Sequence, residues 1–340
     1  MAVASTAARL RARYERMRNL TSALAVVLFA VGVLATPGEA ADVRRIGVLS
    51  LGPSGPFAGR DAFLEGLHAA GYVVGRDLAI EYRFAAGNRD RLQALARELV
   101  AHKVEVIVAE RGQATRAAQA ATRSIPIIMV GSSDPIGTGI AASLGKPGGN
   151  VTGLTLDSTE VSGKRLQLLK ELVPRMSRVA VLLNASDPGK AAELRTLRKA
   201  AHTMRVTLEA VPVKEAAELP VALTTITRLQ PDALVVLADP LTTAHRQAIV
   251  DFAATRRLPA MYELAVFADA GGLAAYGARV PDLFRRAAGL VDKVLRGTKP
   301  GDIPIEQPTT FELVLNLKTA RELGVTPPPT IVVRATRVIE

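Results

Sequence analysis

The 340-residue chain contains no cysteine and no tryptophan, and aromatic residues make up only 4% of it. Without cysteine there is no disulfide, thiolate zinc site, iron–sulfur cluster or cysteine nucleophile, and we expect no lipid anchor on an N-terminal cysteine. Glycine (27 residues) and proline (20 residues) are too few for a collagen-like or low-complexity class. With 49% hydrophobic residues the composition is that of a globular protein, and the length suggests about two domains.

The first forty residues have the layout of a secretory signal. Five arginines precede an apolar stretch at 20–34, which is shorter than the about 20 residues that span a bilayer. Small residues follow at Gly38 and Ala40, as at a signal-peptidase site. We therefore predict a cleaved signal peptide over 1–40, with an uncleaved membrane anchor as the alternative. Met17 is an alternative start, because a complete signal also begins there.

The chain is basic, with a net charge of +11 that falls to +8 without the five arginines and two glutamates of 1–40. Such a balance can indicate nucleic-acid binding. The basic residues are scattered along the sequence, however, and no basic run alternates with aromatic residues. We therefore expect a solvated basic surface and no nucleic-acid partner.

From residue 44 onward, short apolar runs alternate with amphipathic helical patterns. The predicted strands are 44–50, 78–84, 104–110, 126–132, 151–156, 178–184, 206–213, 233–239, 259–263 and 271–277. The predicted helices are 57–70, 89–102, 113–123, 159–172, 189–204, 219–229, 242–256 and 282–295. Several strands are nearly continuous Val, Ile, Leu and Ala, which favours doubly wound parallel sheets covered on both faces.

A weak internal similarity indicates that this α/β pattern forms two similar doubly wound lobes. RRIGVLS at 44–50 and SRVAVLLN at 177–184 each open a series, and the Gly/Pro-rich GKPGGN at 145–150 lies between the two series. Segment 297–310 is expected to be irregular and to wrap a surface or cross between lobes. The predicted boundaries are an N-terminal lobe over 41–155 with about 272–305, and a C-terminal lobe over 156–271 with about 306–340.

Catalytic sequence signatures are absent. The chain contains no G-x-S-x-G, no G-x-x-x-x-G-K-[ST] and no H-E-x-x-H, and 137–139 is an isolated G-x-G without the third glycine of a dinucleotide site. The four histidines fall in predicted helices, and none has a second ligand at the i, i+4 spacing of a zinc site. We predict no catalytic residue, no metal and no cofactor, although a Ser/His/Asp triad assembles in space and stays open.

Polar residues stand at the carboxyl ends of several predicted strands, where ligands dock in open α/β sheets. The candidate ligand-binding residues are Arg111, Gln113, Thr115, Ser132, Ser133, Asp134, Asp239, Tyr262, Glu263 and Tyr276. Hydroxyls and helix N-termini suit a ligand carboxylate, and the carboxylates suit a ligand ammonium. Their distribution over two lobes predicts a cleft.

Each candidate also has a purely structural interpretation. The two aspartates fit helix caps. The two serines fit a turn, Tyr276 fits a buried hinge contact, and Arg111 fits a solvated charge.

Five stretches of the chain point to one family. They are IGVLSLG at 46–52, FLEGLHAAGYVVGRDLAIEYRFAAGN at 63–88, IPIIMVGSSDPIGTGIAASLGKPGGNVTG at 125–153, KRLQLLKELVPRMSRVAVLLN at 164–184, and GGLAAYGARVPDLFRRAAGLVDKVLRGTKPGDIPIEQPTTFELVLNLKTARELGVT at 271–326. On these strings the chain resembles the substrate-binding component of ABC-type importers, in the family that includes tryptophan- and tyrosine-type binding proteins. The resemblance spans about 44–330.

The resemblance implies a type I periplasmic-binding-protein fold, in which two α/β lobes joined by three crossings close over a ligand without catalysis. The pocket positions that it implies are Gln113, Thr115, Ser132, Ser133, Asp134, Asn184, Asp239 and Tyr262. Segment 52–59, GPSGPFAG, makes Phe57 a candidate stacking residue. This segment and 111–113 depart from the tryptophan-binding members, so the resemblance does not fix an aromatic amino acid as the ligand. Arg111 would suit an additional acid group or an aromatic carboxylate.

We therefore expect a monomeric periplasmic receptor that delivers an amino acid or another carboxylate-bearing solute to a membrane permease. The lack of cysteine fits free diffusion in a Gram-negative periplasm. One alternative is a sensory module that presents its closed form to a membrane receptor, and another is an exported α/β enzyme. A repressor of this fold would carry a DNA-binding helix-turn-helix where this chain carries an export signal.

Overall fold

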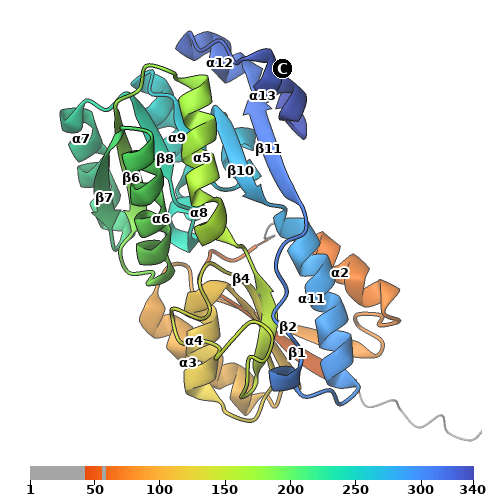
Figure 1. The fold of residues 1–340 in the computed structure, drawn as a ribbon. Coiled ribbons are helices and arrows are strands. Elements are labelled where there is room, and N and C mark those ends of the chain that lie inside the picture. Colours follow the sequence, from red (N-terminus) through yellow and green to blue (C-terminus); the bar gives the residue numbers. More distant parts are fainter. Residues whose placement is uncertain (1–42, 56–58) are drawn as a thin grey trace, which may run out of the picture. The chain divides into compact units, whose positions relative to one another are not determined.

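Two β-sheets form the framework of the protein in the computed structural model, which describes residues 43–55 and 59–340 (Figure 1). The first sheet is parallel, in the order β2-β1-β3-β4-β5. Its strands are β1 (Arg44–Ser50), β2 (Leu78–Phe84), β3 (Val106–Glu110), β4 (Ile127–Ser132) and β5 (Val151–Thr155). The predicted signal peptide and Phe57 lie outside the described residues.

The second sheet has the order β12-β11-β10-β9-β8-β6-β7. Its strands are β6 (Arg178–Asn184), β7 (Thr207–Val213), β8 (Ala233–Val236), β9 (Ala260–Tyr262), β10 (Ala274–Ala278), β11 (Phe311–Asn316) and β12 (Arg337–Ile339). All neighbours are parallel except β10 and β11, which run antiparallel. Both sheets lie in one compact unit, Arg44–Glu340.

Helices cover both faces of each sheet. Those of the first sheet are α2 (Arg60–Ala69) and α11 (Val280–Leu295) on one face, and α3 (Arg89–Ala101) and α4 (Arg111–Ala121) on the other. One face of the second sheet carries α5 (Ser158–Leu172), α6 (Gly189–Thr203), α12 (Leu317–Leu323) and α13 (Pro329–Arg334). The other carries α7 (Leu219–Leu229), α8 (Pro240–Ala244), α9 (Arg246–Thr255) and α10 (Ala265–Asp269). We call the first sheet with its helices the first lobe, and the second sheet with its helices the second lobe.

The continuous apolar runs of the strands follow from this layering. Successive side chains of a strand point to opposite faces. In β3, Val106 and Val108 therefore pack under α2 and α11, whereas Ile107 and Ala109 pack under α3 and α4. A strand that is covered on both faces needs apolar residues at every position, which is why these runs predicted parallel strands correctly.

The chain crosses between the lobes three times, at 156–157, at residue 279 and at 307–310. The predicted doubly wound two-lobe fold with three crossings is confirmed. The sequence placed 272–305 with the first lobe, but β10 pairs with β9 and β11, so the second crossing comes only after Ala278. Beyond it, α11 packs on α2, where Phe284 meets Phe63 edge-on with ring centroids 6.3 Å apart.

Several elements were not predicted from the sequence. The structure contains further elements that the sequence pattern did not predict: the strands β11 and β12 and the short helices α10, α12 and α13. The predicted helix 242–256 is divided at His245 into α8 and α9, and the predicted helix 113–123 begins at Arg111. The antiparallel β10–β11 pair means that the second sheet is mixed, whereas the sequence predicted parallel sheets throughout.

Gly153 shows how tightly β5 pairs with β4. Its φ of +146° lies outside the range that L side chains readily adopt, and a Cβ there would overlap the carbonyl oxygen of Met129. Only glycine allows this approach of the two strands.

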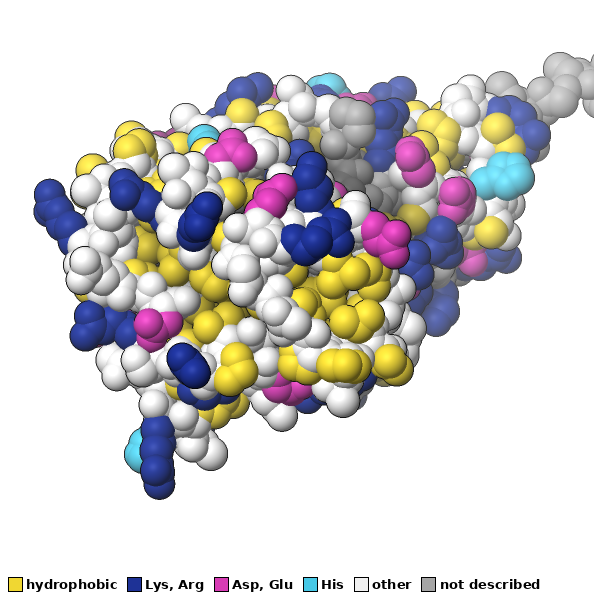
Figure 2. All heavy atoms as spheres, turned by 90° about the horizontal axis from the view of Figure 1, so that it is seen from above, with side chains coloured by type: hydrophobic (Ala, Val, Ile, Leu, Met, Phe, Trp, Pro, Cys, Tyr) yellow, Lys and Arg dark blue, Asp and Glu magenta, His cyan; other side chains and the backbone are white. Residues whose placement is uncertain are grey.

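Membrane-spanning length and the distribution of charge are two further properties of the described residues. Within 43–55 and 59–340, no helix combines the length and apolar character needed to cross a membrane. On the face shown in Figure 2, Lys and Arg side chains are spread among acidic and uncharged ones and form no continuous patch.

Candidate functional site

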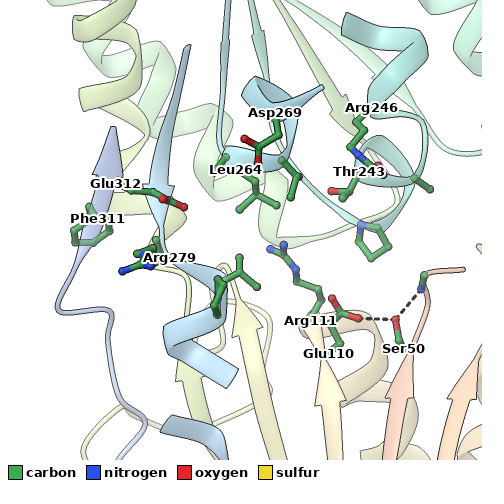
Figure 3. A pocket seen from close by; sticks show the side chains of 18 of the residues that line it. Ser50, Glu110, Arg111, Thr243, Arg246, Leu264, Asp269, Arg279, Phe311 and Glu312 are labelled. Atoms are coloured by element: carbon green, nitrogen blue, oxygen red, sulfur yellow. Dashed lines mark hydrogen bonds between the residues drawn. The ribbon is translucent and has the colours of Figure 1, made fainter. Parts of the chain in front are cut away.

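A cavity of about 770 Å³ lies between the two lobes, within the usual size range of small-molecule sites (Figure 3). The first lobe contributes the carboxyl ends of β1 and β3, with Ser50, Glu110 and Arg111. The second lobe contributes residues on α8, on α10 and on β11. Ligands dock at the carboxyl ends of strands in open α/β sheets, so the cavity occupies the position that the sequence predicted for a cleft.

The lining combines apolar and charged side chains. Its apolar members are Pro53, Pro240, Ala244, Leu264, Ala265, Val266, Ala278, Val280, Pro281 and Phe311. Its charged members are Glu110, Arg111, Arg246, Asp269, Arg279, Glu312 and Arg337. A wall that combines apolar side chains with charged and polar groups suits an amphipathic small molecule.

Arg111 is the first residue of α4 and points into the cavity (Figure 3). Its φ of +70° is left-handed, a conformation that costs a non-glycine residue about 1–3 kcal/mol and is concentrated at functional sites. The side chain is only 9% exposed, and its Nη1 has no hydrogen-bond partner among the described residues. The neighbouring carboxylate of Glu110 instead accepts a hydrogen bond of 2.6 Å from the hydroxyl of Ser50.

Thr243 lines the cavity from the second lobe (Figure 3). Its helix, α8, is fixed by Asp239, whose side chain accepts a hydrogen bond from the backbone of Thr242 at 2.9 Å in a capping box. The Oγ1 of Thr243 is buried, and within the described part of the chain it has no hydrogen-bond partner. Each lobe therefore contributes a cavity-lining residue with a buried polar atom that lacks a partner among the described residues.

Other charged side chains of the cavity interact with partners in the protein itself. Arg337 forms an ion pair of 2.6 Å with Asp269, and Arg246 donates to the carbonyl oxygen of Thr243 at 3.1 Å. Glu312 is half-buried, and burial raises the pKa of its carboxyl against the opposing effect of Arg337 and Arg279.

Behind the cavity, the second lobe holds a buried ion cluster, defined by Arg165, Lys190, Glu193 and Glu263. The ammonium of Lys190 lies 2.5 Å from Glu193 and 3.5 Å from Glu263, and the guanidinium of Arg165 lies 3.6 and 3.7 Å from the same two carboxylates. All four side chains are at most 1% exposed. Two cations and two anions balance each other, which is the condition under which buried charges are tolerated.

The cluster shifts the ionisation of its members in opposite directions. Burial raises the pKa of Glu263, but Lys190, Arg165 and Arg111 outweigh burial and bring it to about 2. Burial and the charge of Glu263 raise the pKa of Glu193. Burial lowers the pKa of Lys190, but the neighbouring carboxylates more than compensate and hold it above its ordinary value.

Of the predicted ligand residues that the structure describes, Arg111 lines the large cavity. Ser132, Ser133 and Asp239 line a second space of about 10 Å³ next to Arg111, which has room for roughly one water molecule. Asn184 donates to the carboxylate of Asp239 at 2.5 Å. These residues lie close together, as the strand-end rule predicts.

The remaining predicted residues that the structure describes do not line the large cavity. Asp134 accepts a hydrogen bond from the backbone of Gly137 at 2.7 Å, as expected for a turn cap. Thr115 donates to the carbonyl oxygen of Arg111, whereas the buried amide of Gln113 has no partner among the residues described. Tyr262 is buried against Phe267, and Tyr276 stacks on the cavity residue Phe311.

Glu263 was expected to pair with a ligand ammonium, but its oxygens already have partners. They accept hydrogen bonds from the hydroxyl of Ser158 and from the backbone of Ala238, in addition to the two cations of the cluster. Both oxygens of Glu263 are thus already paired within the protein. Direct binding of a ligand by Glu263 stays a prediction.

The sequence analysis missed several cavity residues. Ser50 and Glu110 end predicted strands and could have been found by the same strand-end rule. Thr243 follows the strand end at Asp239 and is found by the same rule, but it was not included among the candidate residues. Glu312 could not be found, because its strand was not predicted.

Two doubly wound lobes, three crossings and a cavity at the carboxyl strand ends define a two-lobed solute-binding protein of the type I periplasmic-binding-protein fold. The chain belongs to the family of ABC transporter substrate binding proteins, whose profile matches residues 52–339.

Individual relatives agree with this family. A conserved domain protein from Vibrio cholerae is 26% identical with a TM-score of 0.83, over 87% of this chain and 99% of that one. The ABC domain from Streptococcus pneumonia in complex with L-Trp is 27% identical with a TM-score of 0.77, over 86% and 100%. A tyrosine-binding protein from Clostridioides difficile is 28% identical over 264 residues, which cover 78% of this chain and 76% of that protein.

Proposed function

We propose that this protein is the solute-binding component of an ABC importer and closes its lobes around a small ligand that bears a carboxylate. An amino acid or an aromatic or other organic acid meets this description. The observation that carries the proposal is Arg111, which lines the cavity and has a buried guanidinium whose Nη1 lacks a hydrogen-bond partner among the described residues. A carboxylate forms strong charge-assisted hydrogen bonds with a guanidinium, and here it would also neutralise a buried charge.

Two relatives support this ligand class. The Streptococcus structure contains L-Trp, and the Clostridioides relative is a tyrosine-binding protein, so both names give an amino acid as the ligand. The apolar wall around Leu264 and Phe311 suits the side chain of such a ligand. Hinge closure then converts ligand contacts with both lobes into a closed form, without any catalytic step.

The proposal extends to the cellular setting. A signal peptide over 1–40 would export the chain to the periplasm, where it would act as a monomer and without a lipid anchor. A membrane permease would accept the closed form, and nucleic acid would not be a partner.

A thermal-shift screen with paired compounds tests this function. The panel contains amino acids, aromatic carboxylates, dicarboxylates, nucleosides and sugars, and each acid is matched with its methyl ester or amide. A ligand at 100 times its dissociation constant adds about 2.7 kcal/mol to the free energy of unfolding, which raises the midpoint by several degrees. Because the chain has no tryptophan, indole emission reports directly on an indole ligand.

We expect one class of acids to raise the midpoint and the matched esters or amides to have little effect. Native mass spectrometry first confirms that the purified protein carries no ligand. Equal shifts from an acid and its ester, or no shift from any carboxylate, would contradict the proposal.

A further inference from the structure

Besides enclosing the large cavity, the two lobes contact each other directly between α6 and the segment that follows β4. The Nζ of Lys190 in the second lobe lies 3.3 Å from the Oγ of Ser133 in the first lobe, and it donates a hydrogen bond to it. Ser133 lines the small space beside Arg111 and is not among the described residues that line the large cavity.

Carboxylates of the second lobe hold the Lys190 ammonium in place. Its ammonium has three N–H donors, and two of them have acceptors within the second lobe, at 2.5 Å in Glu193 and at 3.5 Å in Glu263. The hydroxyl of Ser133 is the third acceptor. The lysine side chain is 1% exposed, so its hydrogen bond to Ser133 is shielded from solvent, and separating the lobes would replace that bond by one to water.

The backbone at this contact is shaped for close approach. Gly189 is the first residue of α6, and a Cβ there would lie 3.2 Å from the Cβ of Ser133 and 3.8 Å from the backbone nitrogen of Asp134. The start of α6 therefore rests directly on the first lobe. This leaves no space for a ligand between Gly189 and Ser133.

We propose that Ser133 is a closure contact of the two lobes and not a ligand contact: its hydroxyl completes the hydrogen bonding of Lys190 and favours the closed form whether or not ligand is bound. The inference rests on the proposed function, because the closed form is the one that holds the ligand. Ser133 would then set the fraction of binding-competent protein. The apparent dissociation constant varies inversely with that fraction, equally for every ligand.

The test replaces Ser133 and leaves the ion cluster intact. Removing Lys190 itself would leave Glu193 and Glu263 buried with one cation fewer and would endanger folding. Ser133→Ala deletes one half-buried hydroxyl. Ser143→Ala is the control, because the exposed hydroxyl of Ser143 bonds within the first lobe, where it donates to the carbonyl oxygen of Lys146 and accepts from the backbone N–H of the same residue.

The lobe separation is measured without ligand. The chain has no cysteine, so Gln93→Cys on α3 and Arg198→Cys on α6 introduce a unique pair of spin-label sites on exposed positions of the two lobes. Double electron–electron resonance then gives the populations of short and long distances. We expect Ser133→Ala to lower the ratio of closed to open protein about tenfold, and Ser143→Ala to leave it unchanged.

The affinity of the same variants completes the experiment. Ser133→Ala should weaken every compound that binds, acid or not, by one common factor. An unchanged distance distribution, or an affinity loss confined to one ligand class, would overturn the proposal and make Ser133 a ligand contact. If no carboxylate binds the parent protein, the proposed function fails, but the distance measurement still decides the role of Ser133.

Discussion

Arg111 and Thr243 face the same cavity from opposite lobes, and each presents a buried polar atom without a hydrogen-bond partner among the described residues (Figure 3). An unsatisfied buried donor or acceptor costs about 1–3 kcal/mol. A ligand that satisfies both atoms relieves this cost only when it touches both lobes. Under the proposed function, the pair would link ligand binding to lobe closure through two side chains that lie more than one hundred residues apart in the sequence.

Replacing Arg111 by methionine should remove recognition of the ligand carboxylate and keep most of the apolar stem. Truncating one partner of a buried charge pair costs about 2–5 kcal/mol, so the affinity for acids should fall at least thirtyfold. Isothermal titration calorimetry measures the loss. Arg256→Met, on the exposed C-cap of α9, is the control and should bind like the parent. A loss below threefold for Arg111→Met would show that the carboxylate binds elsewhere.

Thr243→Val should separate ligand binding from stability. Valine has nearly the shape of threonine but lacks the hydroxyl, so we expect an affinity loss of roughly tenfold for ligands that bond to it. The free protein should unfold at the same or a higher temperature, because the buried Oγ1 has no partner to lose within the described chain. A lower midpoint of the free protein in thermal unfolding would contradict this assignment.

Glu263→Gln should destabilise the protein in a pH-dependent way. Removing one charge from the buried ion cluster leaves the others unbalanced, and we expect a loss of about 3–5 kcal/mol at pH 7. The pKa of Glu263 is lowered from 4.5 to about 2, so its ionised form stabilises the fold above pH 4.5. That contribution disappears as the pH falls from 4.5 towards 2.

Urea unfolding of both proteins over this pH range provides the measurement. The stability difference between parent and variant should narrow as the pH falls. A difference that stays constant from pH 7 to pH 3 would mean that Glu263 contributes to stability through shape and not through charge.

Gly153→Ala should destabilise the first lobe strongly. The added Cβ overlaps the Met129 carbonyl oxygen at a φ of +146°, so β4 and β5 must move apart, and we expect a cost above about 3 kcal/mol. Gly145→Ala is the matched control, because a Cβ at Gly145 meets no atom within 4 Å. Chemical denaturation followed by circular dichroism compares the two. Equal midpoints for both variants would refute the close approach of β4 and β5.

The fold could largely be predicted because its strands are short apolar runs that must be buried on both faces. That signal is local, and it located β1 and β3 to within two residues at each end. β11 and β12 follow a Pro/Gly-rich segment and have partners far away in the sequence. Nothing in the local pattern shows that β11 turns back against β10 in the antiparallel direction.

The candidate site was predicted in part. The strand-end rule identified Arg111, because position along the chain suffices to place it at the cleft. It could not tell a free carboxylate from a paired one. Glu263 ends a strand as a ligand residue would, but Arg165 and Lys190 reach it from helices that are distant in the sequence, and only the packed structure reveals those partners.

The return of α11 to the first lobe also affects the timing of folding. Phe63 and its neighbours on α2 complete their core only against α11, which ends at Leu295, whereas β5 ends at Thr155. At about 5–20 residues per second, translation delivers that helix about 7–28 seconds after the first sheet. During this interval the nascent first lobe lacks an apolar layer and cannot reach its native packing, so its uncovered strands stay accessible to chaperones.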